Sequence, residues 1–506
     1  MFDPRKYWNY PFVRHSKEKK LKNFQKFMVY KVVKDIGQPF IIAGWVVTEK
    51  MIDDERRCKA CLIVHGNQTM DDLEIRRDSP TVKKSSLRIQ FFLAAQFGWK
   101  IKSADVTSAF LQSNVLKREV YVRPPSDIHV QGTLWLLRVP VYGMGDAGKE
   151  WYLTISVWLI EAGCKKADLD PAFFFYVKDG QLHGVITLHV DDGTYCGSRR
   201  FEEDIIKPLF ERFQFGKIIT GDFKSLGWNI EQDQRNIYVS QTDYIETLQE
   251  MRVEDQSVLN SKTPLNPTNV SRLRQLIGKL RWVTDQSRPD QSFNELWLSV
   301  MAANPTVKEL KKANRMVRDM QWSEVKLKYK KLGKEKWFIS VFTDASLGKL
   351  PDHVSSAYGI LIFISNGYVV GQRNDCSLLS WKSSKVKRVV SASYDAEVLA
   401  LIEGLEQAII MRKVLVEMLG CPEDMLEIEG FCDNEDTIKA LEYTKTFFKG
   451  NRIGLEVAKL KEMRDRGEVK SISWIPGTFQ LADCLTKEGS SPLPLLEAAQ
   501  KGRFLN

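Results

Sequence analysis

Residues 185–197 read VITLHVDDGTYCG, an apolar run that ends on two adjacent aspartates followed by a glycine. This pattern predicts a hairpin with Asp191 and Asp192 at its tip. Burying an unpaired carboxylate is costly, so these charges need water, a partner or a metal. Neighbouring residues of a strand point to opposite faces, so the two aspartates cannot chelate one ion together in regular geometry. We therefore expect one aspartate to face a site and the other to flank it.

A second short apolar strand ends on an acid in WKIKSADVTSAFL, at Asp105. A hard cation such as Mg²⁺ needs several oxygen ligands, and Asp105 is the best candidate to join Asp191. Two strands that bring these acids together would hold two metals for in-line nucleotidyl transfer. Carboxylates at loop tips are commonly only solvated, so the spacing alone leaves both interpretations open.

The composition favours a folded protein with a polyanionic partner. The chain has 506 residues, a formal net charge of +10 and several basic clusters, which predicts two to four domains and suits nucleic acid. The basic clusters are KEKKLKNFQK at 17–26, SRLRQLIGKLRW at 271–282 and VKLKYKKLGKEKW at 325–337. We find no apolar stretch of membrane-spanning length and no signal peptide, so we expect a soluble intracellular protein. Cys58 and Cys61 form a lone CxxC, which lacks the four ligands of a structural zinc site.

The periodicity predicts an α/β chain with a boundary near 321–337. Strands are expected at 28–34 and 40–48, and basic helical sequence fills 242–320. Other expected helices cover 84–98, 149–162 and 393–418. After residue 337, four consecutive strands are expected and then alternating helices and strands, which indicates a mixed sheet. Those four strands are WFISVFTDAS, AYGILIFIS, GYVVGQR and CSLLSWKS.

Residues 143–148, GMGDAG, match the GxGxxG pattern of dinucleotide-binding proteins. Asp168 even lies where a ribose-binding acid would be sought. However, that acid should end the next strand, whereas Asp168 precedes AFFFYV. An NAD-dependent enzyme that uses Gly143, Gly145 and Gly148 therefore remains a remote alternative.

Ten ordered blocks between about residues 25 and 500 resemble the reverse transcriptase and ribonuclease H region of copia-like LTR retrotransposon Pol proteins. The blocks are KACLIVHGNQ, DSPTVKKSSLR, SADVTSAFLQSNVLKREVYVRPP, VYGMGDAGKEWY, LHVDDGTYCG, SLGWNIEQDQRNIYVSQTDYI, LIGKLRWVTDQSRPD, SWKSSKVKRVVSASYDAEVLAL, CDNEDTIKAL and IPGTFQLADCLTK. The resemblance implies a right-hand polymerase followed by a ribonuclease H-like mixed-sheet domain. Fingers and palm would cover 1–240, a basic thumb and connection 241–336, and ribonuclease H 337–506. GMGDAG then becomes a turn of the palm.

The resemblance also implies roles for single residues of the first half. The metal ligands of the polymerase would be Asp105, Asp191, Asp192 and the backbone carbonyl of Val106. Phe110 would be an aromatic steric gate, because a ring under the incoming sugar clashes with a 2′-hydroxyl. The remaining implied contacts are those of Lys59 and Gly143 with the dNTP, and those of Leu226 and Gly227 with the primer end.

In the second half, four acids on strand, helix, strand and helix resemble the metal ligands of ribonuclease H: Asp344, Glu397, Asp433 and Asp483. Each of the two sites would hold two Mg²⁺, with Mn²⁺ as a substitute. The implied partners are an RNA template, a DNA primer, RNA–DNA hybrid and dNTPs, without a membrane. The implied setting is retrotransposon replication and DNA integration, in a cytoplasmic virus-like particle or in the nucleus. The chain would be the terminal product of a longer polyprotein, or a remnant of one.

Four positions depart from the family pattern. His189 stands where a tyrosine is usual, Cys61 and His65 replace arginines, and Gly148 replaces a common proline. The loop before Asp483 also lacks a histidine that many ribonucleases H use. Losing one charge-assisted phosphate contact at Cys61 would weaken triphosphate binding by roughly 1.5–3 kcal/mol. The alternative function is therefore a decayed or domesticated copy that only binds nucleic acid.

Overall fold

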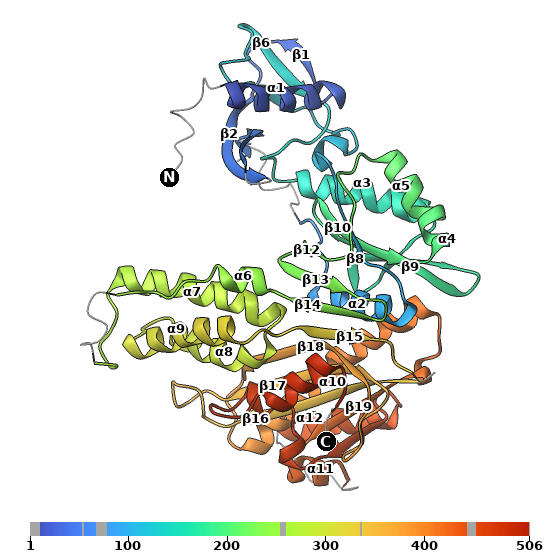
Figure 1. Cartoon of the computed structure of the whole chain (residues 1–506), viewed down its shortest axis with the longest axis vertical. Coiled ribbons are helices and arrows are strands. Elements are labelled where there is room, and N and C mark those ends of the chain that lie inside the picture. Colours follow the sequence, from blue (N-terminus) through green and yellow to red (C-terminus); the bar gives the residue numbers. More distant parts are fainter. Residues whose placement is uncertain are drawn as a thin grey trace.

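The computed structural model describes residues 11–52, 55–66, 78–253, 260–333, 336–442 and 452–504. These residues form four β-sheets covered by helices, and Figure 1 shows them arranged from the N-terminal sheet at the top to the C-terminal sheet at the bottom. The mixed helix and sheet architecture confirms the predicted α/β class. None of the described helices is both long and apolar enough to cross a membrane.

The first sheet has the strand order β1-β6-β5-β2-β3. Its strands are β1 (Tyr30–Lys34), β2 (Ile41–Ile52), β3 (Glu55–Val64), β5 (Tyr121–Arg123) and β6 (Thr133–Leu137). Helix α1 (Pro11–Lys26) packs on β3, and the sequence pattern did not predict it. The apolar residues Val13 and Phe24 are buried and hold α1 in place.

The second sheet carries the hairpin of the opening stretch and has the order β11-β4-β10-β9-β8-β7. Its strands are β4 (Lys102–Asp105), β7 (Lys165–Ala167), β8 (Asp170–Lys178), β9 (Gln181–His189), β10 (Asp192–Gly197) and β11 (Ile219–Thr220). The accompanying helices are α2 (Lys84–Phe97), α3 (Ala147–Glu161), α4 (Arg199–Phe201) and α5 (Lys207–Arg212). The predicted hairpin is confirmed, because β9 and β10 pair antiparallel.

The third sheet joins segments that lie far apart in the chain, in the order β12-β13-β14-β15. Its strands are β12 (Phe223–Ser225), β13 (Trp228–Gln232), β14 (Asn236–Ser240) and β15 (Leu327–Lys330). Between β14 and β15 the chain forms a group of helices that projects to one side in Figure 1: α6 (Thr242–Glu246), α7 (Pro267–Gln286), α8 (Ser292–Met301) and α9 (Val307–Trp322). These helices confirm the helical character predicted for 242–320.

The fourth sheet is mixed, as predicted, with the order β18-β17-β16-β19-β20. Strand β16 pairs antiparallel with β17 and parallel with β19. The strands are β16 (Trp337–Ser346), β17 (Ala357–Ser365), β18 (Cys376–Lys385), β19 (Leu426–Cys432) and β20 (Ser471–Trp474), and the helices are α10 (Ser393–Leu419), α11 (Glu435–Glu442), α12 (Arg452–Asp465) and α13 (Leu493–Lys501). The strand predicted at GYVVGQR is wrong: Gly367 and Gly371 adopt positive φ, so this segment turns instead of extending.

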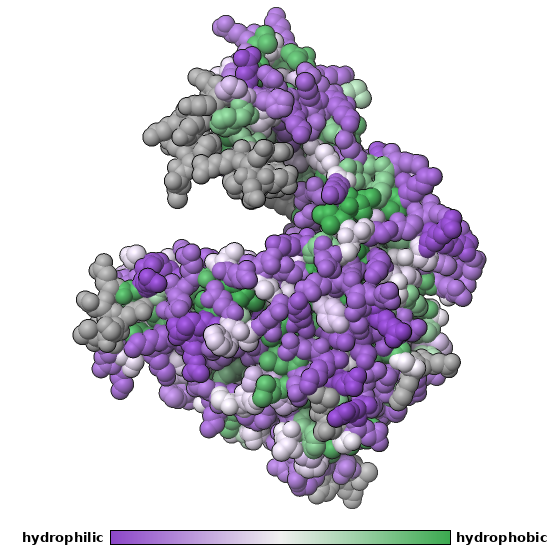
Figure 2. Space-filling view, in the orientation of Figure 1, coloured by the Kyte–Doolittle hydropathy of each residue, from purple (hydrophilic) through white to green (hydrophobic). Residues whose placement is uncertain are grey.

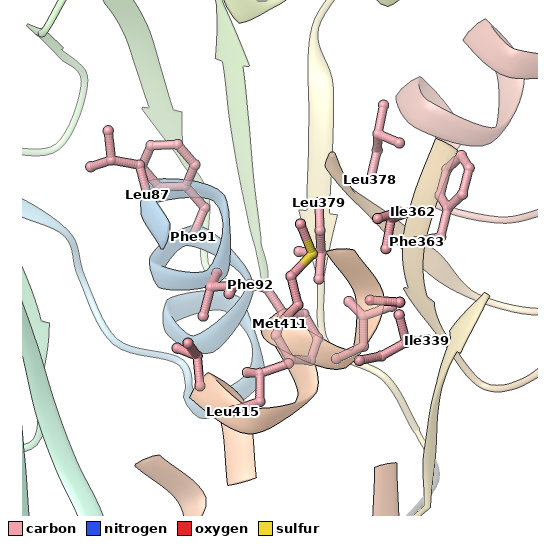
Figure 3. Packing of buried hydrophobic residues seen from close by; sticks show 14 of the residues in the cluster. Leu87, Phe91, Phe92, Ile339, Ile362, Phe363, Leu378, Leu379, Met411 and Leu415 are labelled. Atoms are coloured by element: carbon pink, nitrogen blue, oxygen red, sulfur yellow. The ribbon is translucent and has the colours of Figure 1, made fainter. Parts of the chain in front are cut away.

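Helix α2 joins the second and fourth sheets in one continuous apolar core. Figure 3 shows Phe92 of α2 beside Leu379 of β18 and Met411 of α10, whereas Phe91 lies with Leu87 on the other side of α2. The buried guanidinium of Arg88 adds polar contacts, because it stacks on Trp381 and donates to the carbonyl of Asp285. Burial lowers the pKa of Arg88 to about 10, so the side chain stays charged near neutral pH. The two sheets are therefore packed as one body.

A wide hollow separates the first sheet from the helices α6 to α9, and Figure 2 shows it open to one side. The second sheet lies between the two parts that border the hollow. This arrangement leaves room for a large ligand beside the second sheet.

Candidate active sites

The opening stretch and Asp105 meet in the second sheet. Strand β10 pairs with β4 so that Asp192 lies opposite Asp105, and with β9 so that Asp192 also lies opposite His189. Side chains directly opposite each other in an antiparallel pair lie on one face, with Cβ atoms about 4.5–5.5 Å apart. Asp191 lies outside the paired strands, after Val190, whose φ of 60° turns the chain. The register thus makes Asp192 the direct neighbour of Asp105.

The backbone also binds this turn to β4. The N–H of Val106 donates to the carbonyl of Asp191 at 2.9 Å, so the ends of both strands are fixed side by side. Burial and the neighbouring charge of Asp191 raise the pKa of Asp192, and His189 opposes them. The imidazole that departs from the family pattern therefore lies where it favours the charged form of Asp192.

Tyr142 is a residue of this site that the sequence pattern did not single out. Its ring centre lies 4.8 Å from that of Phe110. Burial and then the charges of Asp191, Cys61 and Asp105 raise the pKa of Tyr142 to about 12, so the hydroxyl keeps its proton. The ring thus contacts the expected gate directly. The sequence signal that could have pointed to Tyr142 is its position directly before Gly143.

Gly143 has φ 96° and lies against β3: a Cβ there would come within 2.0 Å of the carbonyl oxygen of Val64. The Val64 N–H also donates to the carbonyl of Tyr142 at 2.8 Å. GMGDAG is therefore a tight connection onto the first sheet. A dinucleotide-binding motif needs parallel strands of one sheet around its helix. The strands before and after α3 belong to different sheets, which does not fit the NAD alternative.

The remaining residues expected in the first half lie on the first and third sheets. Lys59 is exposed on β3, opposite Thr48. Leu226 and Gly227 both adopt positive φ in the turn between β12 and β13, where a Cβ on Gly227 would lie 3.0 Å from the ring of Trp282 in α7. Cys58 and Cys61 are free thiols, and in the described part of the chain neither belongs to a metal-ligand cluster.

A second group of acids lies at the ends of strands in the fourth sheet. Asp344 is in β16, Asp433 follows β19, and Asp483 begins the short helix η8 (Asp483–Leu485). One carboxylate oxygen from each lies within 4.8 Å of the others. Glu397 of α10 forms a second such group with Cys432 and Asp433. The four acids predicted from the sequence therefore lie together, whereas among the described residues Asp105, Asp191 and Asp192 do not form so close a group.

Burial dominates the electrostatics of this second group. Asp344 is 1% exposed, and burial raises its pKa to about 7 although Lys487 opposes the shift. Burial and the charges of Asp344 and Asp433 raise the pKa of Glu397. Two residues not foreseen in the sequence contact Asp344: the hydroxyl of Thr486 donates to it, and the amine of Lys487 lies 3.2 Å from it.

The donor set suits a hard divalent cation. Carboxylate oxygens are the ligands that such cations prefer, and the three aspartates offer them from separate elements. Lys487 also contacts Asp483 at 2.6 Å, so its charge offsets part of the repulsion among the acids. Glu397 is held by the N–H of Ala345, which donates to it at 3.0 Å.

The chain is similar to known proteins in sequence and in fold. Residues 27–268 match the family described as reverse transcriptase (RNA-dependent DNA polymerase). The chain is 24% identical over 497 residues to the retrovirus-related Pol polyprotein from transposon TNT 1-94 of Nicotiana tabacum, a match that covers 93% of this chain and 36% of the relative. It is 26% identical to that of transposon RE1 of Arabidopsis thaliana, with 70% and 24% covered. A transposon Ty1-NL2 Gag-Pol polyprotein of Saccharomyces cerevisiae is 23% identical, with 86% and 25% covered.

The chain therefore spans about a third or less of these relatives' own length. Among solved structures, a foamy viral protease-reverse transcriptase in complex with double-stranded DNA matches with a TM-score of 0.54 at 12% identity, covering 92% of this chain and 70% of that one. This match supports the polymerase-type fold, and the relatives confirm the copia-like resemblance predicted from the motifs.

We predict that stability without divalent cations falls as pH rises. Asp344 keeps its proton in the folded state between its ordinary pKa of 3.8 and about 7, so over this window the folded state binds more protons than the unfolded state. Each such group then costs up to about 1.4 kcal/mol per pH unit. Melting in chelator should show a lower Tm at pH 8 than at pH 5, and Mg²⁺ should raise the Tm mainly at pH 8.

Asp344→Asn should flatten this pH dependence, because the amide does not titrate. Asp424→Asn, which changes an exposed acid, is the matched control and should melt like the wild type. A Tm in chelator that is constant or rises between pH 5 and pH 8 would contradict the assignment.

Proposed function

We propose that the chain, as one of the copia-like LTR retrotransposon Pol proteins, copies RNA and DNA templates into DNA. It would also degrade the RNA strand of the resulting hybrid. Fingers and palm would comprise residues 1–240, the thumb and connection 241–336, and the ribonuclease H domain 337–506. Retrotransposon replication would be the biological setting.

The pairing of β4 with β10 carries the polymerase part of this proposal. It brings Asp105 and Asp192 opposite each other, with Asp191 in the adjoining turn. These acids end apolar strands of the second sheet, which lies between the two parts that border the hollow. Three carboxylates there would bind the cations of nucleotidyl transfer, with the carbonyl of Val106 as a further ligand. Bound Mg²⁺ or Mn²⁺ supplies charge stabilisation for the attacking and leaving oxygens.

The side chains around these acids would select and orient the substrate. Phe110 would lie under the incoming sugar, supported by its contact with Tyr142. Lys59 and the tight turn at Gly143 would contact the dNTP. The turn at Leu226 and Gly227, backed by Trp282, would hold the primer end.

The nuclease part rests on the second acid cluster. Asp344, Asp433 and Asp483 would hold cations beside the RNA strand, with Glu397 as a fourth ligand. Sensing the 2′-hydroxyl would confine cleavage to RNA. All seven candidate acids are present in the sequence, which favours an active enzyme over a decayed nucleic-acid-binding protein.

The basic residues of α9 would contact the duplex backbone between the two sites. A cavity of about 520 Å³ lies between α9 and the segment after η8, and Lys487 also lines it. Neutralising phosphates releases counterions, so binding should weaken steeply with salt. The basic side chains of α9 that line this cavity are Lys308, Lys311, Lys312 and Arg315.

We predict that the two activities are lost separately. Asp191→Asn should abolish primer extension on poly(rA)/oligo(dT) with Mg²⁺ yet spare cleavage of a labelled RNA–DNA hybrid, because only the palm loses a ligand. Asp433→Asn should do the reverse. Wild type that adds no dNTP would refute the polymerase assignment, and loss of both activities in either variant would refute two separate sites.

The gate assignment makes a second prediction. Phe110→Val should remove the clash with a 2′-hydroxyl and lower dNTP-over-NTP discrimination at least about tenfold, or about 1.4 kcal/mol. Phe110→Tyr keeps the ring and is the matched control. Single-nucleotide addition with dTTP and UTP measures the ratio, and unchanged discrimination in the valine variant would exclude Phe110 as the gate.

A further inference from the structure

Helix α1 is fixed to the first sheet along one face. The N–H of Ala60 in β3 donates to the hydroxyl of Ser16 at 2.8 Å. The buried amine of Lys17 pairs with Asp127 at 2.8 Å and lies over the ring of Trp45. These contacts hold the N-terminal half of α1 against the strand that carries Lys59.

The next turns of α1 lie beside Tyr142 and the loop between Asp105 and Phe110. The amine of Lys20 lies 4.3 Å from the ring centre of Tyr142. The amide of Asn23 lies 3.4 Å from the hydroxyl of Ser108, in the loop between Asp105 and Phe110. Residues spaced three or four apart share a helix face, so the face anchored by Lys17 also presents Lys20 to the site.

Lys20 is partly buried, and within the described residues no carboxylate lies within ion-pair distance of its amine. Burial is the main cause that lowers the pKa of Lys20, and the nearby charge of Lys59 lowers it further. Cys61 acts in the opposite direction. Lys59 and Cys61 are two residues apart on β3 and so share one face of the strand, and α1 packs on β3. An anion bound between Lys20 and Lys59 would therefore relieve the repulsion of their like charges.

The contacts define which anion fits. Phe110 would lie under the sugar of a bound dNTP, Tyr142 touches Phe110, and Lys20 touches Tyr142. A phosphate chain that extended from that sugar toward β3 would pass Lys20 and approach the strand that carries Lys59. Cys61, where the family pattern has an arginine, lies beside them.

We propose that Lys20 of α1 binds the triphosphate of the incoming dNTP together with Lys59, and so supplies the charge that is missing at Cys61. This inference rests on the proposed polymerase function. Helix α1, which packs on the first sheet, would then form part of the nucleotide site.

The test compares the dTTP affinity of four proteins on poly(rA)/oligo(dT): wild type, Lys20→Ala, Lys20→Arg and the double variant Lys20→Ala/Cys61→Arg. Lys20→Ala should raise the KM for dTTP roughly 10- to 100-fold, the loss expected for one charge-assisted contact. Lys20→Arg should stay within about threefold of wild type. The double variant should recover most of the lost affinity, because it returns a cation to the same place.

Lys19→Ala removes an exposed lysine of the same helix and is the matched control: it should leave the KM for dTTP unchanged. A primer that ends in a dideoxynucleotide allows dTTP binding to be measured without nucleotide addition. This separates the test of Lys20 from the test of the proposed polymerase function. Wild type that binds dTTP but does not extend a normal primer refutes the proposed function alone. Equal dTTP affinity in wild type and Lys20→Ala, or no recovery in the double variant, refutes the role of Lys20.

Discussion

Repulsion between carboxylates that are fixed at the ends of apolar strands is the constraint around which both candidate sites are organised. In the second sheet the strand register brings Asp192 opposite Asp105, and in the fourth sheet three aspartates come within 4.8 Å of one another. Such clusters are unfavourable unless cations compensate them. In the fourth sheet Lys487 partly does so, because its amine contacts Asp344 and Asp483.

The apolar core stabilises the fold and so offsets the repulsion between these carboxylates. Helix α2 packs Phe92 against the fourth sheet, where its ring meets Trp337 of β16, and Phe91 against Trp228 and Tyr329 of the third sheet. The sheets that carry the two acid clusters therefore share one core (Figure 3). Burying aromatic side chains contributes about 1.5–3 kcal/mol each. A shared core also fixes the position of one site relative to the other, which suits two activities that would act on one duplex.

The sequence predicted what depends on local pattern. Strands that end on acids, the hairpin at 185–197, the helical stretch 242–320 and the mixed last sheet all follow from periodicity and turn residues, and the structure contains them. GYVVGQR failed as a strand because its glycines adopt positive φ, a choice that hydrophobicity does not reveal. The roles expected for the acids, for Phe110 and for the primer-end turn stay predictions.

Residues that act across long distances in the chain could not be found from the sequence. Lys20 and Lys487 reach their sites from other elements, and no spacing rule links them to Asp191 or Asp344. In the sequence, a charge-rich helix such as α1 looks like an exposed surface helix. Only the packing of α1 on β3 shows which of its lysines point inward. Tertiary contacts therefore determined this part of both sites.

Counting bound Mn²⁺ with electron paramagnetic resonance tests whether both groups of acids are cation sites. Wild type should bind Mn²⁺ at two separable sites. Asp105→Asn should lose binding at one of them, and Asp433→Asn should lose binding at the other. Equal numbers of bound ions with equal affinity in wild type and both variants would contradict this assignment.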